Sequence, residues 1–439
     1  MLGVLSHRTY RHLFMAQVIA LVGTGLATVA LGLLAYDLAG EQAGAVLGTA
    51  LAIKMVAYVT IAPVAGAFAE RLPRRTLLVA LDVVRAGVAL ILPFVTEVWQ
   101  VYVLIFLQQA ASASFTPTFQ ATIPDILPDE REYTKALSLS RLAYDLENLI
   151  SPTLAAMALA VVSFHALFLG TVVGFLASAL LVVSVLLPSP QPTERHGIYD
   201  RTTRGSRIYL ATPRLRGLLA ICLSVAAGGA MVIVNTVVLV QGTLGLEQGA
   251  VALALAAFGG GSMFAALTLP RLLDRFADRT VMLTGVLILA LGLAIGPLIS
   301  SFEALIAIWL GLGIGYSVAQ TPSGRLLRRS AGPEDRAAVF AAHFALSHAC
   351  WLLTYPFAGW FGAFYGLAPT FLVLSATSMA GLILAIRLWP ASDSDVIAHT
   401  HDDLSADDPH LQEGHHLGRN RHCHIFMIDK LHHEWPREH

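Results

Sequence analysis

The chain has 439 residues, of which 56% are hydrophobic and 13% are charged, and its formal net charge at pH 7 is −1. Soluble domains carry about 25% charged residues. This composition, with a mean hydropathy of +0.67, therefore excludes a protein that has water as its main solvent. The net charge alone indicates little, because the arrangement of the charges matters more than their sum.

Apolar stretches recur along the first 390 positions. Each is roughly 20 residues long, the length that an α-helix needs to cross a bilayer, and is too long and uniformly apolar for a barrel strand. The first is too long for a cleavable signal peptide, so we expect it to remain as an anchor. We predict an all-α membrane protein with twelve transmembrane helices, at about 12–38, 43–69, 76–96, 99–122, 136–162, 165–187, 216–241, 249–270, 280–299, 303–322, 337–362 and 366–389.

The sequence contains a long internal repeat. Residues 70–76 return as residues 274–280, with acid, arginine, arginine and threonine in the same places, 204 positions apart. Residues 116–131 and 321–336 form a second pair at almost the same offset. Such a repeat indicates a membrane protein built from two similar halves, as many transporters are. We predict a six-helix bundle at 1–188, a basic central loop at 189–215, a second six-helix bundle at 216–390 and a His/Asp-rich tail at 391–439.

The basic residues outside the predicted spans fall on alternate loops. If the N-terminus is cytoplasmic, the cytoplasmic loops hold all of these arginines and lysines and the opposite loops hold none. By the positive-inside rule, we expect both termini to be cytoplasmic, in a membrane of the bacterial inner type. The residues are Arg71, Arg74, Arg75, Arg131, Lys135, Arg271, Arg275, Arg279, Arg325, Arg328, Arg329 and Arg336, with Arg195, Arg201, Arg204, Arg207, Arg214 and Arg216 in the central loop.

The loop after the second predicted helix resembles the motif between helices two and three of the major facilitator superfamily. The motif has a glycine, an acid, an arginine and a basic pair, and Pro73 stands where the family usually has Gly. A more degenerate second copy is also usual in the family. The matching residues are Gly66, Glu70, Arg71, Arg74 and Arg75, then Asp274, Arg275 and Arg279.

The fifth predicted helix resembles the Gly-Pro-x-x-Gly-Gly element of the superfamily's antiporters, with small residues replacing the glycines. Its residues are Ser151, Pro152, Ala155 and Ala156. The resemblance to the superfamily covers about residues 8–390. The chain looks most like the exporter branch that includes siderophore exporters and nickel-resistance permeases with histidine-rich tails. This resemblance implies export by alternating access in exchange for protons.

The first motif also has a physical interpretation. Its arginines can bind the negative C-terminal end of a helix and anionic lipid, while Glu70 can pair with an arginine of a neighbouring helix. Such an ion-pair latch can form in one state and break in another. The alternative is an anchor that fixes the topology without a gating role.

Ionisable residues inside the predicted spans are concentrated in the first half. They are costly in a bilayer and therefore indicate a functional site or a structural pair. Asp82 and Arg85 on helix three, and Arg141 and Asp145 on helix five, are spaced so that each pair can form on one helix face. Asp82 and Asp145 remain candidates for proton coupling, and Lys54 joins the two arginines in a charge network.

Glu147 is the first candidate for proton coupling. It follows Arg141 by six residues, so it points about 240° around the helix from that arginine. A buried carboxyl without a local cation becomes protonatable near neutral pH. The alternative is an ion pair with Lys54 or Arg85 on another helix.

Lys54 lies too deep in helix two to snorkel, so it either meets an acid or lines a wet cavity. The second half offers His343 and His348 on helix eleven, which lie too far apart around the helix to chelate one metal ion. In the resembled fold helices two and eleven approach each other, which places Lys54 and His348 at similar depth. The alternative is two hydrogen-bonded core histidines. Asp37, near the outer end of helix one, and Asn235 complete the candidates for a cavity wall.

Residues 391–439 hold ten of the chain's 16 histidines, among ten acids and four bases. Imidazole, thiolate and carboxylate together suit divalent Ni, Co, Zn or Cu, so we expect a possible metal site in the tail. The alternative is a solvated acidic tail whose apolar end, residues 425–428, folds against the cytoplasmic loops. The candidate ligands are His399, His401, His415, His416, His422, Cys423, His424, His432 and His433.

Neither a Walker-type loop nor a nucleophile–base arrangement is evident, so we expect neither ATP-driven transport nor an enzyme. We predict a secondary active transporter that exports a small solute, coupled to protons. The substrate is either a divalent metal such as nickel or cobalt, or an amphipathic drug or siderophore; the third alternative is a transport-inactive metal sensor. We expect lipid, substrate and protons as partners, no required cofactor, no nucleic acid, and a monomer.

Overall fold

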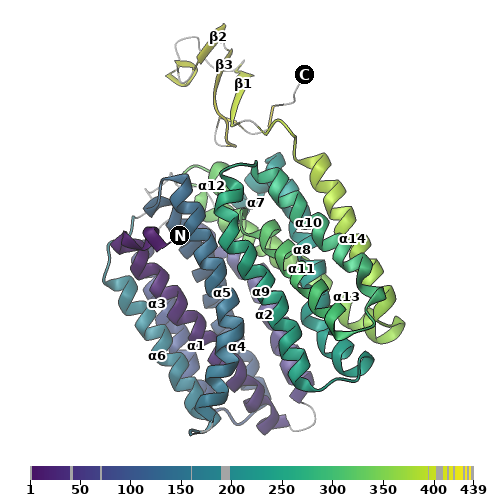
Figure 1. Cartoon of the computed structure of the whole chain (residues 1–439). Helices are drawn as coiled ribbons and strands as arrows, with labels where there is room; N and C mark the ends of the chain where they lie inside the picture. The colour runs from purple at the N-terminus through teal and green to yellow at the C-terminus, as the bar shows by residue number, and fades with distance from the viewer. Residues whose placement is uncertain are drawn as a thin grey trace.

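The structure is a computed structural model, and its bundle consists almost wholly of helices (Figure 1). It describes residues 2–39, 43–69, 72–159, 161–188, 198–393, 395–401, 409–412, 415–418, 421–428, 431–432 and 435–436.

The first half contains six long helices. They are α1 (Arg8–Ala39), α2 (Ala43–Ala69), α3 (Arg74–Ile91), α4 (Val98–Ile126), α5 (Glu130–Leu159) and α6 (Phe164–Val183). Long helices of the second half are α8 (Pro213–Val237), α9 (Gln248–Leu273), α10 (Asp278–Ile295), α11 (Phe302–Gln320), α13 (Arg336–Tyr365) and α14 (Leu367–Leu388). A short helix, α12 (Ser323–Arg329), follows α11, and a π-helical turn, Val238–Thr243, extends α8. Short 3-10 turns lie at Leu2–Ser6, Leu92–Phe94, Gly296–Leu298 and Pro409–Gln412.

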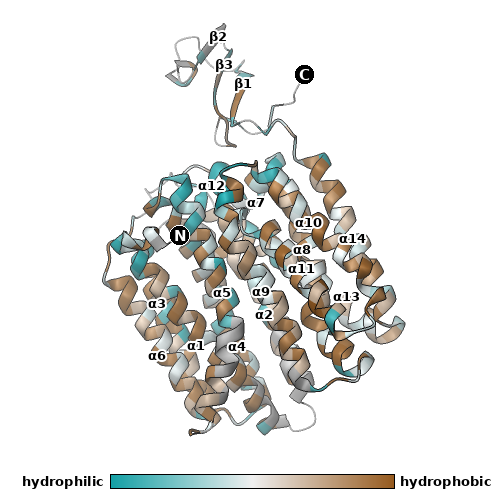
Figure 2. Ribbon diagram, viewed as in Figure 1, coloured by the Kyte–Doolittle hydropathy of each residue, from teal (hydrophilic) through white to brown (hydrophobic). Residues whose placement is uncertain are grey.

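These long helices correspond to the twelve predicted spans, and the all-α prediction is confirmed for the bundle. Within the part of the chain that is described, nine helices are long and apolar enough to cross a membrane, and a shorter apolar stretch, Ala52–Ala65, lies in α2. Segments coloured as hydrophobic run along the bundle, and hydrophilic segments gather at the end near α12 (Figure 2).

The repeat is visible in the helix boundaries. Helices α3 and α10 both have 18 residues, and their first and last residues are each 204 positions apart. Pro73 occupies the N-cap position of α3, with φ −54° and ψ 122°, where its missing N–H leaves no helix hydrogen bond unmade. The first half lies on one side of the bundle and the second half on the other (Figure 1). The halves meet where α5 packs on α9 and α2 packs on α13.

Two glycines let α9 and α11 approach closely within the second half. A Cβ at Gly261 would collide with the carbonyl of Leu310, and one at Gly313 would collide with the carbonyl of Phe258. Small residues at such contacts are typical of membrane helix pairs. This contact fixes the position of Ser262, which follows Gly261 and faces the first half.

The central loop differs from the prediction, because residues 198–211 form a helix, α7 (Ile198–Ala211). Its apolar side packs on α2 and α13, and Ile208 and Tyr209 are buried there. Arg204 of α7 also pairs with Asp335 at the start of α13. The basic residues suggested a loop, but together with the apolar residues between them they form an amphipathic helix.

The tail forms a three-stranded antiparallel sheet of β1 (Val396–Thr400), β2 (His415–Gly418) and β3 (Arg421–Ile425), in the order β1-β3-β2. The sheet and the N-terminus lie at the same end of the bundle as α12 (Figure 1). We call this end the basic face, defined by Arg74, Arg131, Arg279, Arg325 and Arg336.

Candidate functional site

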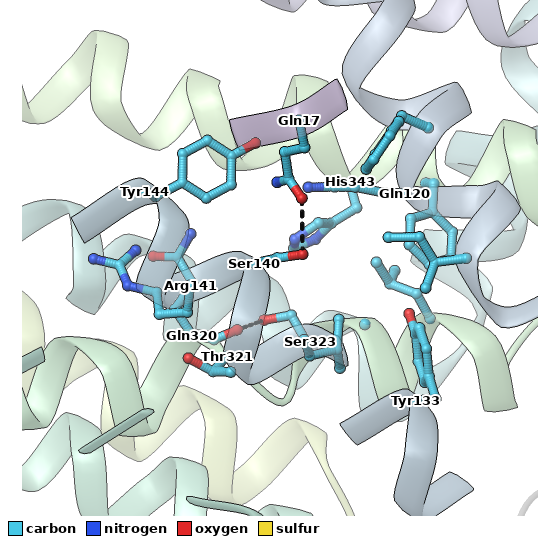
Figure 3. A pocket seen from close by; sticks show the side chains of 16 residues that line it. Gln17, Gln120, Tyr133, Ser140, Arg141, Tyr144, Gln320, Thr321, Ser323 and His343 are labelled. Atoms are coloured by element: carbon cyan, nitrogen blue, oxygen red, sulfur yellow. Dashed lines mark hydrogen bonds between the residues drawn. The ribbon is translucent and has the colours of Figure 1, made fainter. Parts of the chain in front are cut away.

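A cavity of about 140 Å³ lies between the two halves (Figure 3). Helices α1, α4 and α5 provide one wall, and α11, α12 and α13 provide the other. Ser140 of α5 donates a hydrogen bond to Gln17 of α1 within the first wall, at 3.1 Å. The polar lining residues are Gln17, Gln120, Tyr133, Ser140, Arg141, Tyr144, Gln320, Thr321, Ser323 and His343. The apolar ones include Phe119, Ile123, Leu137, Leu327 and Phe340, so the wall suits a molecule with polar and apolar parts.

Two polar atoms in this wall are buried and have no hydrogen-bond partner among the described residues. They are the hydroxyl of Tyr133, on α5, and Oε1 of Gln320, on α11. Buried polar atoms are almost always hydrogen-bonded. A polar ligand or water in the cavity would therefore be stabilised by either atom.

Arg141 and Asp145 form an ion pair that extends across the seam between the halves. Arg141 Nη2 lies 2.6 Å from Asp145 Oδ1. Ser262, from α9 of the other half, donates to Asp145 at 2.7 Å and accepts from Arg141 at 3.0 Å. The guanidinium of Arg141 also lies 4.6 Å from the ring centre of Tyr316 on α11. The charges are thus compensated, and the compensation depends on how the halves sit together.

Asp82 and Arg85 pair on α3, as their spacing predicts, but inside the first half. Ser178 of α6 donates to Asp82 at 2.8 Å. Arg85 lies between the rings of Phe115 and Phe175, at 4.1 and 4.5 Å from their centres. This pair does not line the described cavity, which favours a structural role.

Glu147 has no base within 4 Å among the described residues, although the charge of Lys54 acts on it. The same lysine acts on His348 and lies 5.6 Å from the ring centre of Tyr58. Tyr58 in turn meets His348 edge-on, with ring centres 4.8 Å apart. Helices α2 and α13 therefore bring one base and two polar rings together at the seam.

The four residues that the sequence predicted for a cavity wall lie in different places in the structure. His343 lines the cavity and makes a 3.1 Å hydrogen bond with Tyr209 of α7. The other three do not line it. Asp37 is exposed, Asn235 is buried and donates to the Ala358 carbonyl at 3.1 Å, and His348 bonds the Phe344 carbonyl at 2.7 Å.

The first copy of the loop motif contributes to a closure of the basic face. Arg74 pairs with Asp125 at the end of α4, and Arg336 of the second half pairs with the same carboxylate. Asp125 thus joins α3 and α13. Gly66 lies near the end of α2, while Glu70 and Arg71 lie outside the described residues, so the predicted role of Glu70 stays a prediction.

The second copy closes the same face from the other half. Arg325 Nη2 lies 2.5 Å from Glu130 of α5, and its Nε lies 3.0 Å from Asp278 of α10. Asp274 lies 3.5 Å from Arg131 in an exposed pair. The cross-half latch, as we name it, is the set of ion pairs Arg336–Asp125, Arg325–Glu130 and Arg131–Asp274.

Arg75 and Arg279 lie at equivalent positions of the repeat, and both donate hydrogen bonds to carbonyls at the C-terminal end of a helix. Arg75 donates to the Val183 carbonyl at the end of α6. Arg279 donates to the carbonyls of Ile386 and Trp389 at the end of α14, at 3.2 and 2.9 Å. Both neutralise the negative end of the last helix of their own half. Arg275 is exposed.

The small-residue motif lies within α5, which continues through Pro152 to Leu159. Ala155 is buried. The side chains of Ser151, Pro152 and Ala156 lie outside the described residues, so an antiporter role for this motif stays a prediction.

The tail brings six histidines together: His399, His401, His410, His422, His424 and His432. Of the predicted ligands, His415 is exposed and, like Cys423, belongs to neither group of converging side chains, while the side chain of His416 lies outside the described residues. His433 lies outside the described residues. Burial lowers the pKa of His399 to about 4, so this ring is neutral at pH 7.

Several residues of these sites were not predicted as such, namely Asp125, Glu130, Ser262, Arg325, Arg336, Asp393, Asp395 and His410. Six of them are charged, and only their packing identifies their partners. One available signal was the i,i+2 spacing of His399 with His401 and of His422 with His424, which places each pair on one face of a strand.

The sequence model of the Major Facilitator Superfamily matches residues 13–247 and 218–403. Macrolide efflux protein A of Enterococcus faecalis is 24% identical over 152 residues, which cover 32% of this chain and 47% of the relative. Multidrug resistance protein MdtL of Klebsiella pneumoniae (strain 342) is 27% identical over 303 residues, covering 65% of this chain and 71% of the relative.

The first three matches to curated relatives span only 36–47% of the length of those relatives. Among solved structures, the human organic anion transporter MFSD10 superposes with a TM-score of 0.75 at 12% identity, covering 86% of this chain and 99% of that one. At this identity the likeness concerns the fold alone.

Proposed function

Because the chain belongs to the Major Facilitator Superfamily, we propose that it is a secondary transporter that exports a small amphipathic organic molecule in exchange for protons. The observation that carries this proposal is the cavity between the halves, whose wall combines aromatic, amide, hydroxyl and guanidinium groups. The similarity to a macrolide efflux protein and a multidrug resistance protein supports an organic substrate.

The cross-half latch supports a mechanism of alternating access. Arg325–Glu130 and Arg336–Asp125 join the halves at the basic face. If this face is cytoplasmic, as the positive-inside rule predicts, the described conformation is closed toward the cytoplasm. Opening it requires these pairs to separate, so that a solute can enter from the cytoplasm before the halves rock back.

Glu147 is the residue that we propose for proton coupling. Its carboxylate is influenced by the charge of Lys54 on α2, whereas Asp82 and Asp145 each have an arginine and a serine as partners. A proton on Glu147 would cancel its attraction to Lys54 on α2. Because α2 packs on α13 of the other half, this change reaches the surface along which the halves move.

A metal ion as the transported solute has less support. Among the described residues, the groups of three or more converging metal ligands lie in the tail and not in the cavity. His343 and His348 make separate hydrogen bonds, to Tyr209 and to the Phe344 carbonyl.

The test uses purified protein in liposomes with an imposed pH gradient and a fluorescent amphipathic cation or macrolide inside. We expect proton-driven movement of the compound, and loss of its dependence on the gradient in Glu147→Gln. Glu303→Gln, at an exposed position at the start of α11, is the matched control and should transport normally. Gradient dependence that survives in Glu147→Gln would exclude that residue, and movement of any solute would exclude a transport-inactive sensor.

A further inference from the structure

Six imidazole rings converge on one side of the tail sheet. The strand pair β1–β3 places His399 opposite His422, and the ring centres of these two are 4.6 Å apart. The centres of His410 and His422 are 4.7 Å apart, and those of His399 and His432 are 4.8 Å apart. Three segments distant in the sequence therefore meet around His399.

The hydrogen bonds of His399 define what its ring offers to its neighbours. Nδ1 lies 3.0 Å from the Ile397 carbonyl, and because a carbonyl only accepts, Nδ1 carries the proton. In the neutral ring Nε2 then presents a single lone pair. That lone pair faces two other nitrogens, Nε2 of His422 at 3.1 Å and Nε2 of His432 at 3.0 Å. One lone pair accepts one in-plane hydrogen bond, so it cannot satisfy both neighbours, whereas a cation would be attracted by the nitrogen of His399 together with that of either neighbour.

We propose that this histidine cluster binds one divalent transition-metal ion, and that the ion holds the tail sheet together. Metal–imidazole bonds of about 2.1 Å place tetrahedral nitrogen ligands about 3.4 Å apart, close to the two separations around His399. Neutral imidazoles without carboxylates suit Zn, Co, Ni or Cu rather than Mg or Ca.

The stoichiometry follows from shared ligands. Two groups of four converge: one joins His399 and His410 with His401 and His432, and the other joins the same two with His422 and His424. In each group the ligand atoms lie within 4.8 Å of one another. Since each residue offers one atom and both groups need His399 and His410, only one group is filled at a time. Nε2 of His401 is also buried without a hydrogen-bond partner among the described residues.

The strands that the structure describes in the tail form only a small sheet. Its strands have only four or five residues each, and units of this size generally need a disulfide or a metal. Phe426 packs under the cluster, with ring centres 4.9 Å from His399 and 5.1 Å from Trp435. Asp395 attaches the sheet to the bundle, with oxygens 2.7 Å from Arg214 and 2.9 Å from Arg329.

The experiment uses the full chain in detergent, purified through a tag without histidine, stripped with a chelator and dialysed against buffered Zn²⁺. We expect one Zn²⁺ per chain by elemental analysis, and a Co²⁺-loaded protein with the visible absorption of tetrahedral nitrogen ligation. Hydrogen exchange of residues 395–401 and 421–428 should slow when Zn²⁺ is added.

Variants separate this site from non-specific binding by histidines. His399→Ala and His410→Ala should each weaken Zn²⁺ binding by about 100-fold, whereas His422→Ala, which leaves the other group of four intact, should weaken it by about 10-fold. His415→Ala, on the same sheet but outside the cluster, should change it less than about 2-fold.

Equal losses in His399→Ala and His415→Ala would overturn the proposal, as would stripped wild-type protein that takes up no stoichiometric Zn²⁺. The proposal is independent of the transport reaction, because binding is measured without a gradient. Glu147→Gln should bind Zn²⁺ like the wild type even if it fails to transport, so failure of one proposal leaves the other standing.

Discussion

Arg74 and Asp278 occupy equivalent positions in the two halves, as the first residues of α3 and α10, and carry opposite charges. Around Arg74 the order of charges is plus, minus, plus, through Asp125 to Arg336 of the other half. Around Asp278 it is minus, plus, minus, through Arg325 to Glu130 of the other half. The two sets of three charges thus have the same arrangement with opposite signs.

The shared carboxylate should matter most in this arrangement. We expect Asp125→Asn to lower the free energy of unfolding by about 3 kcal/mol, because two largely buried guanidinium groups lose their counter-ion. Asp274→Asn, which breaks an exposed pair with Arg131, should cost at most about 1 kcal/mol. Thermal unfolding of the purified variants in detergent would measure both, and equal losses would contradict the assignment.

The arginine at the end of α14 gives a second prediction. Arg279→Ala removes two donors from the carbonyls of Ile386 and Trp389, so we expect a loss of about 1–2 kcal/mol. Arg275→Ala removes the same charge from a neighbouring exposed site and should lie within about 0.5 kcal/mol of the wild type. If both variants melt alike, the net charge of the loop and not the helix end would be the cause.

The seam between α5 and α9 gives a third prediction. Ser262→Ala removes hydrogen bonds to both Arg141 and Asp145, and groups left unsatisfied in this way cost about 1–3 kcal/mol. Thr268→Ala, on the same helix, removes only bonds to that helix's own Phe264 and Ala265 carbonyls and should be close to neutral. Differential scanning fluorimetry of the two variants distinguishes the cases, and an unchanged melting temperature for Ser262→Ala would show that the seam does not use it.

The attachment of the tail gives a fourth prediction. Asp395→Asn should speed hydrogen exchange in β1 more than Asp393→Asn does, because Asp393 lies 3.6 and 3.8 Å from Arg214 and Arg329, farther than Asp395. Exchange rates that rise equally in both variants would contradict this ranking.

The effect of Asp395 should also have a defined pH range. Burial alone would raise the pKa of Asp395, but hydrogen bonds from Arg329 and Arg214 outweigh it and hold the pKa below its usual range. The pair therefore stabilises docking fully above the unfolded carboxyl pKa of about 3.9, and the stabilisation is lost as the pH falls through the lower folded value. The difference in exchange between wild type and Asp395→Asn should be constant from about pH 5 to 8, and a decline within that range would refute the sign.

Local spacing predicted part of the site and could not predict the rest. Arg141 and Asp145 lie four apart on one helix, so their pairing follows from helix geometry. Ser262 completes that pair from 117 residues away, and Asp125 meets Arg336 from 211 residues away. No periodicity within a segment specifies such contacts, because they depend on how the two halves pack.

The tail shows the same division. Histidines that are adjacent in sequence, His415 and His416, were predicted as ligands, but His415 lies outside the converging cluster. His410 belongs to the cluster because a separate 3-10 turn, Pro409–Gln412, places it beside β3. The long helices were easier to predict from the sequence, since continuous apolar stretches of membrane length permit few alternative structures.

Asp278 is the counter-ion of two arginines, and each arginine has a different second partner. Arg325, at 3.0 Å, also reaches across to the first half, whereas Arg329, at 3.4 Å, also holds the tail through Asp395. In the proposed opening, the halves part and Arg325 loses its ion pair with Glu130. Arg325 then pairs more strongly with Asp278, and the charge of Arg329 is compensated mainly by Asp395. Separation of the halves and attachment of the tail are then thermodynamically linked with the same sign, and the linkage is reciprocal. Whatever tightens the tail on Arg329 favours opening toward the basic face.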